Sequence, residues 1–128
     1  MANTITFERP IDIEDAVRLA LTGHITTYCR PLPKDFTLPC ILVSKVGGTE
    51  EDKIDTHEVV LDARASTEYE ADLTLRNAVG ILRSGQAGGI RYVFVNSTGG
   101  WGSDPARPDL ALCSARLRVV AHVERTTM

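Results

Sequence analysis

The sequence predicts an α+β domain, in which a mainly antiparallel four-stranded sheet carries one helix on a face and a short helix precedes the sheet. Two segments have the helical spacing of apolar residues, and four segments alternate or are rich in β-branched residues. Their order is helix, strand, strand, helix, strand, strand. Strands adjacent in sequence usually pair as antiparallel neighbours, and a sheet buries its apolar face against a helix. At 128 residues, we expect a single domain covering residues 1–128.

The first helix is predicted over Ile13–Thr22. Apolar residues recur at i, i+3, i+4 and i+7, Asp12 is a candidate N-cap, and Gly23 is a natural stop. The following segment, Arg30–Pro39, contains three prolines. Proline excludes a long helix, so we expect an extended connector within the domain.

The first two strands are predicted over Cys40–Val46 and His57–Ala65. The second alternates apolar and polar residues, which is typical of a half-buried strand. Between them lies Gly47–Thr56, ten residues with four acids and one base, an excess equal to the net charge of −3 of the whole chain. This segment is too long for a tight hairpin, and we interpret it as a solvated loop that becomes ordered against a partner.

The second helix is predicted over Glu68–Arg83 and begins with the spacing of a capping box. Its main apolar stripe is expected to face the sheet. Tyr69 and Leu73 fall on the opposite side, beside Arg76. They form either a second, intermolecular packing face or a pair of singly exposed apolar residues, which are common.

The last two strands are predicted over Ile90–Asn96 and Leu110–Glu124, joined by a loop over Ser97–Asp109. The first has apolar residues on both faces, including Tyr92 and Phe94, so we expect both faces to be covered. The second would span about 50 Å at about 3.3 Å per residue, more than a domain of this size needs. Either a bulge bends it or its end projects to meet another chain.

Composition argues against several classes of protein. A net charge of −3 without a basic tract argues against nucleic-acid binding dominated by phosphate contacts. No apolar run approaches the roughly twenty residues that span a bilayer. Cys29, Cys40 and Cys113 lack the spacing of zinc ligands. Cys40 and Cys113 lie within apolar runs, so we expect them to be buried thiols in a reducing compartment.

No group of residues has the pattern of a catalytic, metal or cofactor site, so we expect no enzyme. Gly99–Gly102 follows a strand, but the prolines after it disfavour the helix that a phosphate-binding loop needs. His24, His57 and His122 are scattered over three elements. Cys29 would be a nucleophile only if a base such as His24 approached it in space.

Short segments along nearly the whole chain carry a family resemblance. They are Ile13–Leu21, Phe36–Pro39, Val46–Gly48, Asp52–Asp55, Val59–Ala65, Glu70–Ala71, Trp101 and Asp104–Pro105. Through them the chain resembles the tail terminator proteins of long, non-contractile-tailed bacteriophages (siphophages). The resemblance implies a homohexameric ring in the tail neck of the virion, assembled in the host cytoplasm. Such a ring binds the last ring of tail-tube subunits, stops their polymerisation, and offers its other side to the head connector or stopper protein.

Three groups of residues are the expected contact sites, because a ring needs two different patches on each subunit and further surfaces for its partners. The loop toward the tail tube or neck comprises Gly47, Gly48, Glu50, Glu51, Asp52, Lys53 and Asp55. The ring interface comprises Tyr69, Leu73, Arg76, Arg116 and Arg118. The neck-contact loop comprises Trp101 and Asp104. The arginine pair on the last strand equally suits an ordinary solvated sheet face. We expect no sequence-specific nucleic acid and no membrane among the partners.

Two alternatives remain open. A head-completion or stopper protein of the neck has the same size, charge and α/β composition. A small oligomeric α+β enzyme or ligand-binding domain belongs to a different class and needs a pocket of converging polar groups. His24, Cys29 and Trp101 are the residues that such a pocket could use.

Overall fold

The computed structural model describes residues 3–51, 54–84, 89–104 and 107–128, which form two sheets and two helices. A five-stranded sheet has the order β2-β3-β4-β6-β5, and β1 and β7 form a separate two-stranded ribbon. Strand β2 is parallel to β3, and all the other pairs are antiparallel. In chain order the elements are β1 (Thr6–Arg9), α1 (Ile13–Leu21), β2 (Thr27–Cys29), β3 (Cys40–Glu51), β4 (Ile54–Ala65), α2 (Glu68–Arg83), β5 (Ile90–Asp104), β6 (Arg107–His122) and β7 (Glu124–Thr127).

The predicted four-stranded, mainly antiparallel sheet is therefore wrong. The chain is mostly β, its larger sheet is mixed, and β1, β2 and β7 were not expected. These three strands are only three or four residues long, too short to show an alternating pattern. Pairing partners far away in the sequence hold them in place: Thr6 of β1 is hydrogen-bonded to Thr127 of β7.

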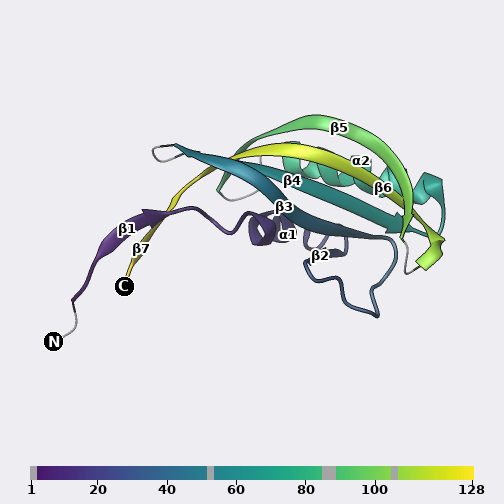
Figure 1. Cartoon of the computed structure of the whole chain (residues 1–128), viewed down its shortest axis with the longest axis horizontal. Coiled ribbons are helices and arrows are strands. Elements are labelled where there is room, and N and C mark those ends of the chain that lie inside the picture. Colours follow the sequence, from purple (N-terminus) through teal and green to yellow (C-terminus); the bar gives the residue numbers. More distant parts are fainter. Residues whose placement is uncertain (1–2, 52–53, 85–88, 105–106) are drawn as a thin grey trace.

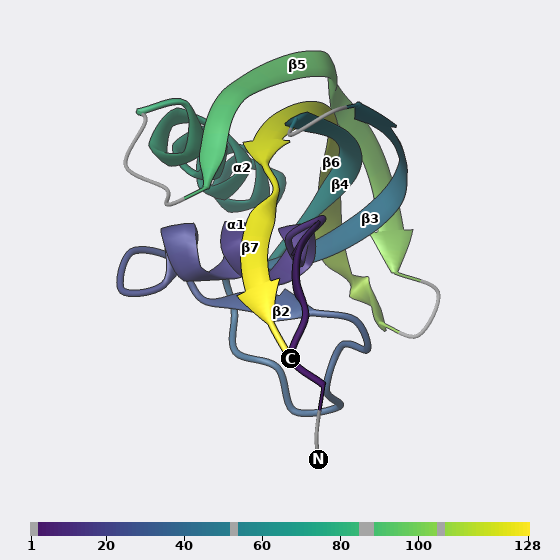
Figure 2. The same ribbon diagram turned by 90° about the vertical axis from the view of Figure 1, so that its left-hand side faces the viewer.

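The larger sheet is curved, and both helices lie on its concave side (Figures 1 and 2). Alternate residues of β4 and β6 point to this side, where Leu61 and Leu117 are fully buried together with Val17 of α1 and Leu82 of α2. The predicted alternation of β4 is confirmed by its burial pattern. Neither helix covers the convex face, so that face of the sheet is left to solvent or to a partner.

Both predicted helices are confirmed. The Asp12 side chain accepts a hydrogen bond from the Asp15 N–H at 3.1 Å, and Thr67 caps α2 in the same way. Each cap satisfies a backbone donor that the first helical turn cannot pair internally. The caps therefore set where each helix begins.

Glu14 joins α1 to the sheet. Its Oε2 accepts hydrogen bonds from the Arg30 guanidinium at 2.6 Å and from the Lys45 N–H of β3 at 2.9 Å. Burial disfavours the ionised carboxylate, but the hydrogen bonds from Lys45 and Arg30 outweigh it and hold the pKa of Glu14 below its usual range. The contact therefore stabilises the packing of the helix as long as Glu14 is ionised.

The predicted loop Gly47–Thr56 is a hairpin instead. Strands β3 and β4 remain paired as far as Glu51 opposite Ile54, with a register shift between Lys45 and Gly47. Gly48 has a φ of +155° next to this shift. Glycine and acidic residues suggested a loop, but here glycine permits the irregular backbone of a bulge within a continuous strand.

The predicted loop Ser97–Asp109 is also wrong, because β5 continues to Asp104 and β6 begins at Arg107. Several register shifts along the β5–β6 pair admit the glycines into the strand. The expectation for the last strand is partly met: β6 ends at His122, and the chain continues as β7, which projects from the body of the domain beside β1 (Figure 1).

Candidate functional site

The β3–β4 hairpin holds the residues expected to contact the tail tube. Gly47 and Gly48 lie in β3, as does the backbone of Glu50 and Glu51. The side chains of these two glutamates, and Asp52 and Lys53 altogether, lie outside the described residues. The described part of the hairpin therefore extends to one end of the sheet as two paired strands, as far as Glu51 opposite Ile54 (Figure 1).

Asp55 does not belong to an exposed acidic surface. It is only 1% exposed and shares the concave face of β4 with His57, which is also buried. Its Oδ2 has no hydrogen-bond partner among the described residues. The backbone of a strand fixes the direction of every side chain, including that of a carboxylate. The alternation of His57–Ala65, extended back by two residues, places Asp55 on the same face as His57.

Helix α2 exposes an acidic face that also carries Tyr69. Tyr69 is 70% exposed, and Arg76 forms an ion pair with Asp72 at 2.8 Å. Glu68 and Glu70 are exposed in the first turn. We name this surface the helix face: Glu68, Tyr69, Glu70, Asp72 and Arg76.

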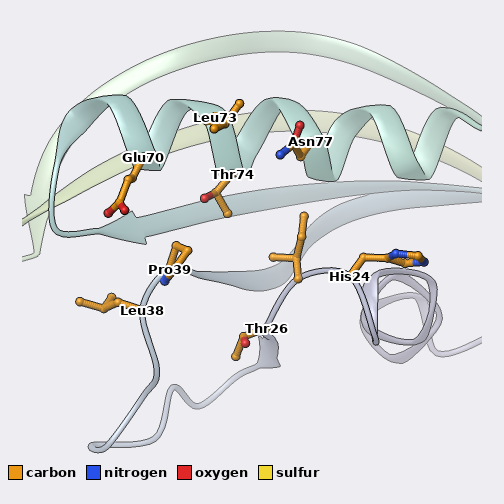
Figure 3. A pocket seen from close by; sticks show the side chains of 9 residues that line it. His24, Thr26, Leu38, Pro39, Glu70, Leu73, Thr74 and Asn77 are labelled. Atoms are coloured by element: carbon orange, nitrogen blue, oxygen red, sulfur yellow. The ribbon is translucent and has the colours of Figure 1, made fainter.

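A pocket of about 400 Å³ adjoins the helix face (Figure 3). Thr74 points from α2 toward Pro39, while Glu70 and His24 lie at its two ends. Leu73 lines this pocket and is half-buried, so it is less exposed than the predicted packing face required. The walls come from α2, the turn after α1 and the segment immediately before β3, three segments that sequence patterns alone do not bring together.

The convex face of the sheet carries an aromatic and basic surface. Tyr92 and Phe94 on β5 are 59% and 47% exposed, so the prediction that both faces of this strand are covered is wrong within the single chain. Their ring centroids are 6.3 Å apart, and the Arg118 guanidinium lies 5.4 Å from the Phe94 ring. We name this surface the convex patch: Arg91, Tyr92, Phe94, Arg116 and Arg118.

Both predicted arginines belong to the convex patch and are exposed. Arg118 stands opposite Phe94 in the register of β5 and β6, and Arg91 lies over the Tyr92 ring at 5.8 Å. An arginine stacked on an aromatic ring is held in place while its N–H groups stay available. The sequence missed the aromatic half of this surface because β5 is an edge strand without a covering helix.

No family model matches this chain. No curated protein matches it either. The resemblance to tail terminators therefore remains a prediction, and the two surfaces and the pocket are the observations on which a function can be argued.

Trp101 and Asp104 do not lie in a loop. Their backbone belongs to β5, where Trp101 stands opposite Cys113 of β6, and their side chains lie outside the described residues. The assigned neck-contact loop is thus the far part of a β-hairpin. Glycines between two apolar segments predict a turn, but strands with bulges also contain glycine.

The thiols have no sign of activation. Burial, with a smaller contribution from nearby Glu14, raises the pKa of Cys29, and burial raises the pKa of Cys40. Cys40 and Cys113 are buried, as predicted. A thiol with a raised pKa is a weak nucleophile at neutral pH.

In the described part of the chain, histidine, cysteine and acidic side chains form no group of three that could hold a metal ion. Neither α1 nor α2 is long and apolar enough to cross a membrane.

Proposed function

We propose that the protein is a structural ring subunit of a phage neck, the tail terminator that caps the tail tube and joins it to the head connector. The observation that carries this proposal is the presence of two different exposed surfaces of opposite charge, the convex patch and the helix face. A closed ring requires two unlike surfaces on each subunit that meet around a circle. The resemblance of the sequence to tail terminators supports the same role.

The β3–β4 hairpin is the proposed contact with the tail tube. It extends to one end of the sheet, and Glu50 and Glu51 of the chain's most charged segment lie in the last part of β3. Charged contacts of this kind set partner choice and encounter rate. The proposal is tested by adding the protein to polymerising tail-tube subunits. Tubes should stop growing and show a ring at one end in negative-stain images, and an unchanged length distribution would refute the proposal.

Substitution tests the hairpin better than deletion does, because Asp55 is buried and its removal would damage the fold. The variant Glu50→Lys with Glu51→Lys should weaken capping. The control Glu8→Lys reverses a single exposed charge on β1 and should cap normally. Equal capping by both variants would contradict the assigned role of the hairpin.

The same assay separates the terminator from a stopper protein of the neck. A stopper would bind the head connector and leave tube growth unchanged, whereas a terminator caps the tube. A ligand-binding domain is a second candidate, because the pocket beside α2 gathers Glu70, Thr74, Asn77 and His24. A small molecule that copurifies with the protein in native mass spectrometry and is lost in Glu70→Gln would favour that function.

A further inference from the structure

The convex patch presents exposed aromatic rings, and the α2 pocket is a hollow lined partly by apolar residues. Tyr92 and Phe94 stand out from the edge strand of the sheet, and the pocket has a volume of about 400 Å³. Pockets of about 300–1,000 Å³ enclose groups the size of small ligands. Leu73 and Pro39 supply apolar wall to receive a ring, and Asn77 supplies a polar group at the margin.

The two surfaces also have complementary charge. The convex patch carries three exposed arginines, and the half-buried Glu58 of β4 stands opposite only one of them, Arg118. The helix face carries three carboxylates and one arginine that is already paired with Asp72. Glu70 belongs to both the helix face and the pocket wall. An aromatic ring entering the pocket would therefore bring its neighbouring arginines close to carboxylates.

We infer that a second copy of this chain occupies the pocket: the Tyr92–Phe94 pair of one subunit inserts beside α2 of the next, with Arg116 and Arg118 facing the acidic first turn of α2, whose Glu70 lines the pocket. Two convex patches repel one another, and so do two helix faces. Only a head-to-tail arrangement, in which the convex patch of one subunit meets the helix face of the next, avoids both repulsions. Such contacts close into rings or continue as filaments. Tyrosine and arginine are also the residues that most often dominate binding at interfaces. This inference rests on the proposed ring function and names the contact that builds the ring.

Charge reversal in separate chains tests the contact. The sheet variant carries Arg116→Glu and Arg118→Glu, and the helix variant carries Glu68→Lys and Glu70→Lys. Each variant alone should bind itself at least about tenfold more weakly than the unchanged protein. An equimolar mixture should regain association, because each reversed surface then meets its reversed complement. Sedimentation equilibrium up to about 1 mM measures contacts of millimolar strength.

Matched controls exclude a general effect of charge or folding. Arg125→Glu and Glu8→Lys reverse exposed charges on the ribbon and should leave association unchanged, and circular dichroism checks the fold of every variant. Phe94→Ala should also weaken association about tenfold, because it removes the inserted ring. The inference is overturned if the unchanged protein stays monomeric over this range, if the mixture does not recover, or if the ribbon controls weaken association equally.

The capping assay distinguishes failure of this contact from failure of the proposed function. If the unchanged protein and both charge variants cap tail tubes equally well, the ring function stands and this contact is wrong. If the unchanged protein associates through the contact but never caps tubes, the contact stands and the proposed function is wrong.

Discussion

Gly48→Ala should weaken the β3–β4 hairpin more than any other single glycine substitution in that hairpin. A Cβ at position 48 would lie 2.5 Å from the Thr56 carbonyl oxygen and 3.2 Å from the His57 Cα. Both atoms belong to the backbone of the paired strand, so no side chain can rotate away to make room. The φ of +155° at Gly48 is also one that other residues rarely adopt.

The expected loss of unfolding free energy combines two contributions. A non-glycine residue held in a disfavoured backbone region costs about 1–3 kcal/mol. Moving the strands apart to relieve the contact weakens a ladder hydrogen bond, which contributes about 1 kcal/mol. We therefore expect a loss of about 2–4 kcal/mol, a large share of the roughly 5–15 kcal/mol that stabilises a typical domain.

Urea denaturation followed by circular dichroism measures this loss, and the neighbouring glycine supplies the control. A Cβ at Gly47 would approach only the flexible Glu58 side chain, at 3.5 Å. Gly47→Ala should therefore cost less than about 1 kcal/mol. If the two variants differ by less than about 0.5 kcal/mol, the reasoning from the backbone contact is refuted.

Four further predictions concern other parts of the chain. Glu14→Gln should lower the unfolding free energy by about 1–2 kcal/mol at neutral pH. Because the pKa of Glu14 is lowered in the folded state, the difference from the unchanged protein should shrink as the pH falls below the ordinary glutamate pKa. Denaturation measured at several pH values would contradict this if the difference stayed constant. Leu117→Ala should cost about 2–5 kcal/mol, whereas exposed Arg116→Ala should change stability by less than about 0.5 kcal/mol; equal losses would contradict the assigned burial. Gly80→Ala should stabilise the monomer by about 1 kcal/mol, because an added Cβ meets open space on α2, and a lower thermal midpoint would argue against it. Cys29 should react with iodoacetamide more slowly than free cysteine at neutral pH, because its pKa is raised, and labelling followed by mass spectrometry would expose a faster reaction.

The two helices could be predicted from the sequence because their signals lie within a few neighbouring residues. Asp12 and Thr67 begin their helices through hydrogen bonds within one turn, and a stripe of apolar residues extends over each helix. The short strands could not be predicted, because they depend on pairing between segments far apart in the sequence. Strand β1 exists because β7 pairs with it, and no window of neighbouring residues contains that information.

The exposed residues of the two candidate surfaces also differ in whether neighbouring residues or the sheet order determines their exposure. The exposure of Tyr69, Arg116 and Arg118 follows from the periodicity of a single helix or strand. The exposure of Tyr92 and Phe94 depends on β5 being the outermost strand, which is a property of sheet order. The charge of Asp55 predicts contact with solvent, whereas its position in the alternation of β4 places it inside.

The ribbon of β1 and β7 (Figure 1) also constrains the order of folding. Thr6 and Thr127 are 121 positions apart, so the ribbon can close only after nearly all of the chain has been synthesised and collapsed. An isolated two-stranded ribbon is marginally stable, so it should form last and open first. Until β7 arrives, β1 is an unpaired edge, and the threonine, glutamate and arginine that flank its one phenylalanine give the nascent chain a mainly polar edge that resists pairing with other chains.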